Sequence, residues 1–327
     1  MPRVALSEKD IKALTDFLGS VSKDPLEFVR LAFPWGEPNT QLEDKAGPDE
    51  WQIELLNDIK EGLKTPDQVI REAVASGHGI GKSAMVAWII LWAISTHEDT
   101  KGVVTANTDT QLKTKTWAEL AKWYYLFVAR DLFTYSATSI YSNQEGHEKT
   151  WRIDAIPWND SNPAAFAGLH NQGKRTLVIF DEASEISDII WEVAEGAMTD
   201  ADTEIIWCVF GNPTQSSGRF HACFHKNRSL WNRKQIDSRT VKISNKAELE
   251  GWRVQYGEDS DFFKIRVKGE FPSASDKQFI STALVDEARR RTLQEKQFRF
   301  APVIIACDPA WTGGDETVIY LRQGLFT

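Results

Sequence analysis

The chain has 327 residues, of which 42% are hydrophobic and 26% are charged, as in an ordinary soluble globular protein with a substantial core. Its net charge of −9 argues against nonspecific DNA binding by the whole surface, because a phosphate backbone attracts concentrated positive charge. The three cysteines are too widely spaced for a zinc knuckle or a disulfide framework, which fits a reducing cytosol. The longest apolar run, residues 84–94, is too short to cross a membrane, and the first ten residues lack the apolar core of a signal peptide.

Residues 1–48 are predicted to form an N-terminal arm or lid. Ser7 can cap a helix that runs to Phe17, after which prolines and glycines interrupt any long element. A further helix is expected to start at Asp49, where apolar residues recur at spacings of three or four along one face. The core of the protein is predicted to begin there.

Residues 49–272 have the cadence of an α/β domain. Apolar runs typical of strands alternate with helical stretches, and the runs contain no polar alternation, as expected of parallel strands buried on both faces. Strands are predicted at residues 69–75, 102–106, 176–180 and 204–210, and helices at residues 82–95 and 109–129. We therefore expect a mainly parallel central sheet.

A glycine-rich junction follows the first predicted strand. The sequence SGHGIGKS matches the phosphate-loop pattern GxxxxGK[ST], except that Ser76 replaces the first glycine. Its glycines let the backbone wrap around a phosphate, Lys82 reaches the β- and γ-phosphates, and Ser83 holds Mg²⁺. The alternative is a tight turn between strand and helix. The predicted ATP-binding residues are Ser76, Gly77, His78, Gly79, Ile80, Gly81, Lys82 and Ser83.

The strand at residues 176–180 ends in two acidic residues, in the sequence LVIFDE. Such a strand places Asp181 at its carboxyl end, where the carboxylate can hold the water shell of Mg²⁺, and Glu182 can polarise the attacking water. Capping of a buried strand by an acid is the alternative when the motif stands alone. Together with the phosphate loop, it predicts ATP hydrolysis.

Further residues fit an ATP-driven motor. Gln52 offers a donor and an acceptor to an adenine edge, although it is equally a polar residue on a helix face. Gly211 and Asn212 can sense the γ-phosphate and couple its loss to movement, or form an ordinary turn. Arg175 or its neighbour Lys174 can supply positive charge to the phosphate in a neighbouring subunit, or merely solubilise a loop. The predicted catalytic residues are Lys82, Glu182 and Arg175.

A basic stretch at residues 219–242 is the best candidate for local DNA contact. It contains a single acidic residue, Asp237, and interleaved aromatic residues. Arg228, Arg233 and Lys234 are the predicted DNA-binding residues, and a solvated loop is the alternative.

The composition changes after Pro272. Residues 273–297 are predicted to form a polar linker with a basic, helix-like end, and residues 298–327 to begin a second domain with two strands. Asp308 ends the first of these strands and Asp315 lies in the turn beyond it, where carboxylates can bind a metal or simply suit a turn. Because two strands do not make a stable domain, we expect the sequence to end inside this domain.

Together these stretches resemble the large terminase subunit of tailed bacteriophages, the ATPase and nuclease that packages viral DNA into a prohead. The order of the motifs carries as much weight as any single one. They are residues 49–52, SGHGIGKS, AFAGLH at residues 165–170 ahead of VIFDEAS, GNPT, residues 256–262, residues 268–272 and DPAWTGGD.

The resemblance implies a RecA-like P-loop ATPase of the ASCE class joined to an RNase H-like nuclease. Asp308 then stands where the nuclease has its first aspartate for Mg²⁺ or Mn²⁺. The phosphate loop has His78 and Ile80, whereas terminases often carry an arginine there. Since the remaining nuclease ligands are missing, we expect ATP binding and slow hydrolysis but no DNA cleavage.

The resemblance also implies partners and a location. It implies double-stranded DNA, a portal or procapsid, a small terminase subunit and a homo-oligomeric ring, in the cytoplasm of an infected bacterial host and without a membrane. A superfamily-2 helicase-like ATPase would share the motifs but need a second RecA-like domain, which the sequence does not indicate. A nucleotide-switched assembly protein would bind ATP without turnover, and Glu182 beside Asp181 argues against it.

Overall fold

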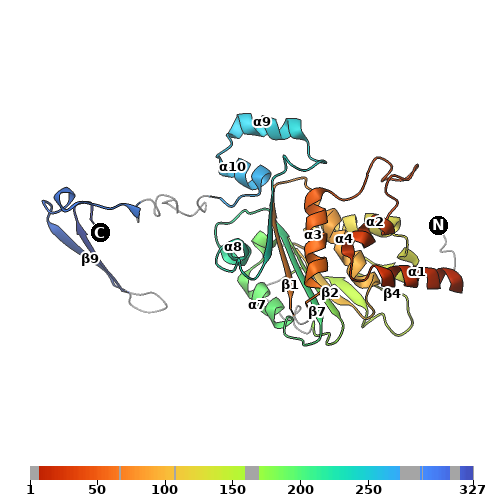
Figure 1. The fold of residues 1–327 in the computed structure, drawn as a ribbon. Coiled ribbons are helices and arrows are strands. Elements are labelled where there is room, and N and C mark those ends of the chain that lie inside the picture. Colours follow the sequence, from red (N-terminus) through yellow and green to blue (C-terminus); the bar gives the residue numbers. More distant parts are fainter. Residues whose placement is uncertain are drawn as a thin grey trace. The chain divides into compact units, whose positions relative to one another are not determined.

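The computed structural model describes residues 7–65, 68–106, 108–158, 169–272, 288, 290–309 and 317–326. Contacts within the chain divide it into two compact units, Met1–Pro272 and Ser273–Thr327 (Figure 1). The first unit contains the phosphate loop and the acidic pair.

The first unit is built on a sheet that has eight strands among the described residues. Strands β1, β2, β5, β6, β7 and β8 run parallel to one another, and β3 and β4 form a hairpin at one edge in which β4 pairs antiparallel with β5. This confirms the predicted α/β fold with a mainly parallel sheet. In sheet order the strands are β3 (Phe133–Tyr135), β4 (Ser139–Ser142), β5 (Arg152–Ala155), β2 (Lys101–Thr105), β6 (Arg175–Asp181), β7 (Glu204–Gly211), β1 (Ile70–Ser76) and β8 (Asn232–Ile236).

Helices cover both faces of this sheet. Alternate strand residues, such as Ala73 and Val74 of β1, belong to two separate apolar clusters, as the pleat of a strand requires. The larger cluster contains residues of α1 (Glu8–Ser20), α2 (Pro25–Ala32), α3 (Glu50–Gly62), α4 (Lys82–Ser95) and α6 (Ala118–Leu126), and the smaller one contains residues of α7 (Asp188–Gly196) and α8 (Gly218–Phe224) (Figure 1). The sheet is therefore the middle layer of three.

The helix expected at residues 109–129 is interrupted. It consists of a short turn α5 (Asp109–Gln111), a π-helical stretch η1 (Leu112–Trp117) and then α6. A π-helical stretch inserts extra residues into a helix and changes the direction of its side chains. Here it includes Thr116, which contacts the acidic end of β6.

The N-terminal segment belongs to the core of the first unit and is not a separate arm or lid. Phe28 and Val29 of α2 are fully buried, and α2 contacts both α3 and α4. Pro25 does not interrupt a helix here. It occupies the first turn of α2, where a missing N–H removes no hydrogen bond. The Asp24 side chain caps that turn by accepting a hydrogen bond from the Glu27 N–H.

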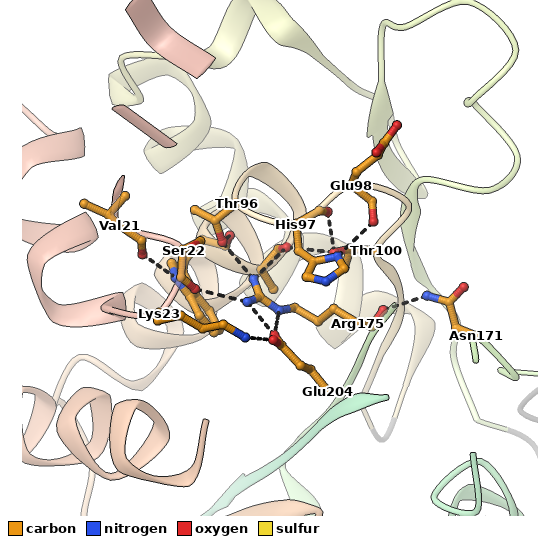
Figure 2. Close-up of polar contacts among 12 residues, drawn as sticks. Val21, Ser22, Lys23, Thr96, His97, Glu98, Thr100, Asn171, Arg175 and Glu204 are labelled. Carbon is orange, nitrogen blue, oxygen red and sulfur yellow. Dashed lines mark hydrogen bonds and ion pairs between the residues drawn. The ribbon is translucent and has the colours of Figure 1, made fainter. Parts of the chain in front are cut away.

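A buried arginine fastens this N-terminal segment to the sheet. The Arg175 side chain is fully buried at the start of β6, and its guanidinium donates to Glu204 Oε2 at 2.7 Å, Thr96 Oγ1 at 2.7 Å and the Ser22 carbonyl at 3.1 Å (Figure 2). The guanidinium also lies 4.2 Å from the centre of the Trp92 ring. Burial lowers the pKa of Arg175 to about 9, which leaves it charged at neutral pH. The network joins four parts of the chain at the amino end of the sheet.

The last part of the first unit forms a small cap of helices. It comprises α9 (Lys246–Tyr256), α10 (Asp261–Phe263) and the π-helical turn η5 (Lys264–Lys268), which pack around Leu249, Phe263 and Val267. Its final turn, η5, contacts β1.

The second unit contains an antiparallel pair of strands, β9 (Val303–Asp308) and β10 (Val318–Gln323), in which Asp308 is paired with Val318. A short turn, η6 (Glu295–Gln297), precedes them. Both strands lie within two residues of the strands predicted at residues 302–307 and 317–321. Asp315, most of the predicted linker and most of AFAGLH lie outside the described residues, so the RNase H-like assignment stays a prediction.

Among the described residues, no helix has the length and apolar character needed to span a bilayer.

We predict that Arg175→Ala destabilises the protein by about 3 kcal/mol, because it removes a fully buried guanidinium and leaves its Thr96 and Ser22 acceptors unpaired, while Glu204 keeps its ion pair with Lys23. Urea unfolding followed by circular dichroism measures this loss. Lys174→Ala is the matched control, since Lys174 is half-exposed and its ion pair with Asp99 is worth about 1 kcal/mol or less. Equal stability of the two variants would contradict the anchoring role of Arg175.

Stability is also predicted to depend on Glu72, which is buried in β1. Its Oε1 accepts a 2.8 Å hydrogen bond from Asn232 Nδ2, whereas its Oε2 has no partner among the described residues. Burial raises the pKa of Glu72 from 4.5 to about 8, so the folded protein holds a proton that the unfolded chain has lost. The stabilisation that the protonated Glu72 side chain contributes is therefore fully present below pH 4.5, and it is lost as the pH rises through 8.

We therefore expect Glu72→Gln, which stays neutral, to have a free energy of unfolding that falls less steeply than that of wild type between pH 5.5 and 8.5. The difference between the two slopes should amount to at least about 1 kcal/mol over this range. Urea titrations at several pH values measure it, and parallel curves for the two proteins would show that Glu72 does not titrate in this range.

Candidate nucleotide-binding site

The carboxyl ends of β1, β7 and β6 meet at one edge of the sheet. Parallel pairing aligns Ala75 with Gly211, and Phe210 with Asp181. This register places the phosphate loop, the Gly211–Asn212 turn and the acidic pair side by side. It is the edge at which open parallel sheets bind their ligands.

The phosphate loop enters this edge through Gly77, where only a glycine fits. A Cβ at Gly77 would lie 2.4 Å from the Val267 carbonyl oxygen and 2.7 Å from that of Arg266. The Gly77 N–H donates to the Ile236 carbonyl at 3.1 Å, and the His78 N–H donates to the Arg266 carbonyl at 2.8 Å. Close contact with β8 and η5 thus fixes the first half of the loop.

The second half of the loop turns into α4 and is open. Gly79 and Gly81 have φ values of 71° and 85°, which side-chain-bearing residues rarely adopt, and a Cβ on Gly79 would meet no atom within 4 Å. The turn delivers Lys82 and Ser83 as the first residues of α4. This shape leaves room for an anion at the start of a long helix, where its partial positive charge favours phosphate.

Two residues of α3 donate hydrogen bonds to carbonyls of the loop. Trp51 Nε1 donates to the Ile80 carbonyl at 3.2 Å, and Gln52 Nε2 donates to the Gly81 carbonyl at 3.3 Å. The other end of the Gln52 amide accepts a 2.8 Å hydrogen bond from the Asp49 N–H. Gln52 therefore positions the loop, a role that its place on a helix face did not indicate, and its contact with adenine stays a prediction.

Asn212 joins the phosphate loop to the end of β7. Its Oδ1 accepts a 3.1 Å hydrogen bond from Lys82 Nζ, and its Nδ2 donates to the Ser76 carbonyl at 2.5 Å. The Asn212 carbonyl accepts a further hydrogen bond from Ser184 Oγ, just beyond the acidic pair. Asn212 is thus the polar bridge between the loop and the acidic strand.

Asp181 is buried at the end of β6 and is held by two donors. Its Oδ2 accepts a 2.5 Å hydrogen bond from Thr116 Oγ1, and its Oδ1 accepts one of 3.1 Å from the Glu182 N–H. Burial, and then the charge of Glu182, raise the pKa of the Asp181 carboxyl. Sequence reasoning missed Thr116, because it lies 65 positions before Asp181 and in an interrupted helix.

Glu182 has a left-handed backbone, with φ 55° and ψ 45°. For a residue other than glycine this conformation costs about 1–3 kcal/mol, and such residues gather at functional sites. The turn begins the 3₁₀-helix η4 (Ala183–Glu185), so the chain changes direction immediately after the acidic pair.

The oxygen donors suit a magnesium ion. Ser83 offers a hydroxyl in the first turn of α4, and Asp181 offers a buried carboxylate at the end of β6, which lies two strands from β1 in the sheet. Hydroxyl and carboxylate oxygens, supplemented by water and phosphate oxygens, are what Mg²⁺ prefers in nucleotide sites. These two residues are therefore the ones that would hold it.

A cationic side chain from η5 also reaches the loop. Arg266 Nη1 lies 3.3 Å from His78 Nε2. Burial, followed by the charges of Lys82 and Arg266, lowers the pKa of His78, so the ring is neutral at pH 7 and accepts this hydrogen bond. Arg266 lies 188 positions after His78, and no spacing pattern in the sequence indicated it.

Other predicted residues lie elsewhere. Arg175 begins the seven-residue strand that Asp181 ends, so the two are about 20 Å apart, and its guanidinium is consumed by the buried network. The prediction that Arg175 acts on a phosphate is wrong. Lys174 pairs with Asp99 at 3.3 Å, and Asp308 is an exposed residue of the second unit.

The three predicted DNA-binding residues differ in their surroundings. Arg228 and Arg233 are exposed, whereas the Lys234 side chain is only 13% exposed and pairs with Asp58 at 2.7 Å and Glu54 at 3.3 Å. Lys234 is therefore the least available of the three for a phosphate backbone.

Comparisons with known proteins show what this chain is similar to. No protein-family model matches the chain. A protein of Enterobacteria phage P7 described as a probable terminase large subunit is 27% identical over 266 residues, which are 77% of this chain and 52% of that protein. The chain thus spans about half the length of this curated relative.

Solved structures show the fold. The large terminase of bacteriophage HK97 matches with a TM-score of 0.56 and 11% identity over 92% of this chain and 67% of that one. The large terminase of a thermophilic bacteriophage, in complex with ADP, matches with a TM-score of 0.53 and 13% identity over 84% of this chain and 64% of that one. The predicted resemblance to the large terminase subunits of tailed bacteriophages is thereby confirmed.

Proposed function

We propose that the chain hydrolyses ATP and that this reaction drives the packaging of double-stranded viral DNA. One observation carries the proposal: Lys82 of the phosphate loop and the acidic pair at the end of β6 lie at one edge of the sheet, and Asn212 bridges them. The large terminase of the thermophilic bacteriophage was solved with ADP and with ATP-gamma-S, which supports a nucleotide as the ligand of this chain.

The residues divide the work by position. The open turn at Gly79 and Gly81 and the start of α4 bind the phosphates, and Lys82 contacts the β- and γ-phosphates once it leaves Asn212. Ser83 and Asp181 would hold Mg²⁺, which would supply positive charge against the charge that develops on the phosphates. Glu182 orients and polarises the attacking water.

Asn212 is well placed to report the state of the nucleotide. It bonds to Lys82, to the backbone of Ser76 in β1 and to the hydroxyl of Ser184 in η4, so a change in the partner of Lys82 alters contacts with both elements. This supports the proposed coupling role of Gly211 and Asn212 over an ordinary turn. Asn212 would then make different contacts in different nucleotide states, and a motor requires such a difference to convert hydrolysis into movement.

The packaging role is supported by the named relatives, since the proteins of P7, HK97 and the thermophilic bacteriophage are all described as large terminases. The portal or procapsid, the small terminase subunit, a homo-oligomeric ring and the host cytoplasm form part of this proposal. We also propose that Asp308 is the first ligand of a nuclease that uses Mg²⁺ or Mn²⁺. The helicase-like alternative is not favoured.

We predict that Lys82→Ala and Glu182→Gln both abolish phosphate release, with a fall in turnover of at least about 100-fold, because each removes a group that acts on the transferring phosphate or the attacking water. Glu182→Gln should still bind ATP, since it keeps the shape of the site. Colorimetric phosphate release and binding of a fluorescent ATP analogue measure the two properties.

The matched controls for turnover are Lys64→Ala and Glu250→Gln, which change exposed ion-paired residues just beyond α3 and in α9. Both should hydrolyse ATP like wild type. Wild-type turnover in Glu182→Gln would overturn the role given to that carboxylate.

For DNA contact, we predict that the double variant Arg228→Ala/Arg233→Ala weakens binding of double-stranded DNA and lowers the slope of log affinity against log salt by about 2, because each lost phosphate contact contributes about 0.9. Lys234→Ala should leave the slope unchanged, since two carboxylates already pair with Lys234. Fluorescence anisotropy across a salt series measures both. An unchanged slope in the double variant would remove this surface from the proposal.

A further inference from the structure

Phosphoryl transfer from ATP needs a positive charge on the terminal phosphate, beyond the loop lysine and the metal ion. Charge spreads over the phosphate oxygens in the transition state, and an arginine that contacts them is worth about 10³–10⁵ in turnover. The burial of Arg175 leaves this role open. The following inference rests on the proposed ATPase function and deepens it.

The backbone of η5 is fixed against the phosphate loop. The Arg266 carbonyl accepts the 2.8 Å hydrogen bond from the His78 N–H, and the neighbouring Val267 carbonyl accepts one of 2.8 Å from the Ser238 N–H. Ser238 Oγ in turn donates to the His78 carbonyl at 2.7 Å. Both backbone polar groups of His78 are therefore hydrogen-bonded. Because the Arg266 carbonyl accepts one of these bonds, the backbone of Arg266 is held against the loop.

Two glycines let η5 pack tightly against the phosphate loop. Gly269, with φ 65°, follows η5, and a Cβ there would lie 2.7 Å from Ser76 Cα. Gly77 of the loop lies similarly close to the Arg266 and Val267 carbonyls of η5. The segment that carries Arg266 thus cannot drift away from the loop without breaking several contacts.

The side chain of Arg266 is exposed but ordered by two neutral neighbours. Its Nη1 contacts His78 Nε2 at 3.3 Å, and its guanidinium lies 5.0 Å from the centre of the Phe262 ring. Among the described residues it forms no ion pair, whereas Arg239 and Arg253 nearby in sequence are each paired with carboxylates. A guanidinium has five N–H donors, so most of those on Arg266 remain free for an anion.

The position of His78 identifies the end of the nucleotide that Arg266 faces. His78 lies two residues after Ser76, whose carbonyl accepts a hydrogen bond from Asn212, and Asn212 also contacts Lys82 and Ser184. Lys82 and Glu182 are the residues proposed to contact the γ-phosphate and the attacking water. Arg266, which contacts His78, therefore lies beside the part of the loop that Asn212 connects to Lys82 and to the end of the acidic strand.

We propose that Arg266 contacts the terminal phosphate of ATP within the same chain and stabilises the charge that develops there during hydrolysis. In the structure the guanidinium donates to Nε2 of the His78 ring. When ATP binds, it exchanges this neutral acceptor for the phosphate oxygens, a charged acceptor that makes a stronger hydrogen bond. Because ADP lacks the terminal phosphate, Arg266 also distinguishes ATP from ADP.

The test uses the whole 327-residue chain with Arg266→Ala, Arg266→Lys and the control Arg253→Ala, whose guanidinium pairs with Glu250 in α9. Turnover should fall by about 1,000-fold in Arg266→Ala, while Arg266→Lys should recover part of it because it keeps the charge but not the fork of donors. Arg253→Ala should match wild type.

Binding separates this role from a merely structural one. Arg266→Ala should bind ADP like wild type but lose the preference for ATPγS over ADP, as measured by isothermal titration calorimetry with each nucleotide. Turnover equal to that of Arg253→Ala would overturn the proposal. So would an equal loss of affinity for both nucleotides, since that would mean that Arg266 only positions the loop.

Failure of the proposed function has a different signature. If the wild-type chain releases no phosphate, the ATPase proposal fails for this chain. The role of Arg266 is then still decided by binding: a wild-type preference for ATPγS that disappears in Arg266→Ala supports it, and an unchanged preference refutes it.

Discussion

The parallel pairing of β1, β7 and β6 is the constraint on which the site depends. Because the three strands run in one direction and in fixed register, their last residues must meet at a single edge. The phosphate loop lies more than a hundred positions from Asn212 in the sequence, yet this pairing places the two in contact and sets the acidic pair beside them. A one-residue slip of β7 would turn Asn212 away from Lys82, since side chains alternate along a strand.

The sequence predicted well those features that rest on local chemistry. The helix at residues 82–95 agrees with α4 at both ends, because the glycine turn that starts it and its continuous apolar surface are both local signals. The four predicted strands of the parallel sheet lie within about one residue of β1, β2, β6 and β7, because strands buried on both faces are uniformly apolar. The strands β3, β4 and β5 are only three or four residues long and gave no such signal.

What the sequence could not indicate depends on contacts between distant segments. Arg175 and Arg266 illustrate this. Arg175 stands next to an acidic strand in the sequence, but its partners are Glu204, Thr96 and Ser22, so it is a structural anchor (Figure 2). Arg266 lies between two of the motifs, residues 256–262 and 268–272, neither of which indicated a phosphate contact, yet β8 and η5 carry it to the phosphate loop. Proximity along the chain is therefore a poor guide to the role of an arginine, whose long side chain is placed by tertiary packing.

The hydrogen bonds between the loop and its neighbours also act as a mechanical connection. Gly77 and His78 donate their backbone N–H groups to β8 and η5, and Gly269 packs against the loop itself. Any displacement of the first half of the loop must either break these hydrogen bonds or drag η5 with it. Only a few residues separate η5 from Pro272, where the first unit ends. A displacement at the phosphate loop thus has a short covalent route to Pro272, the last residue of the first unit.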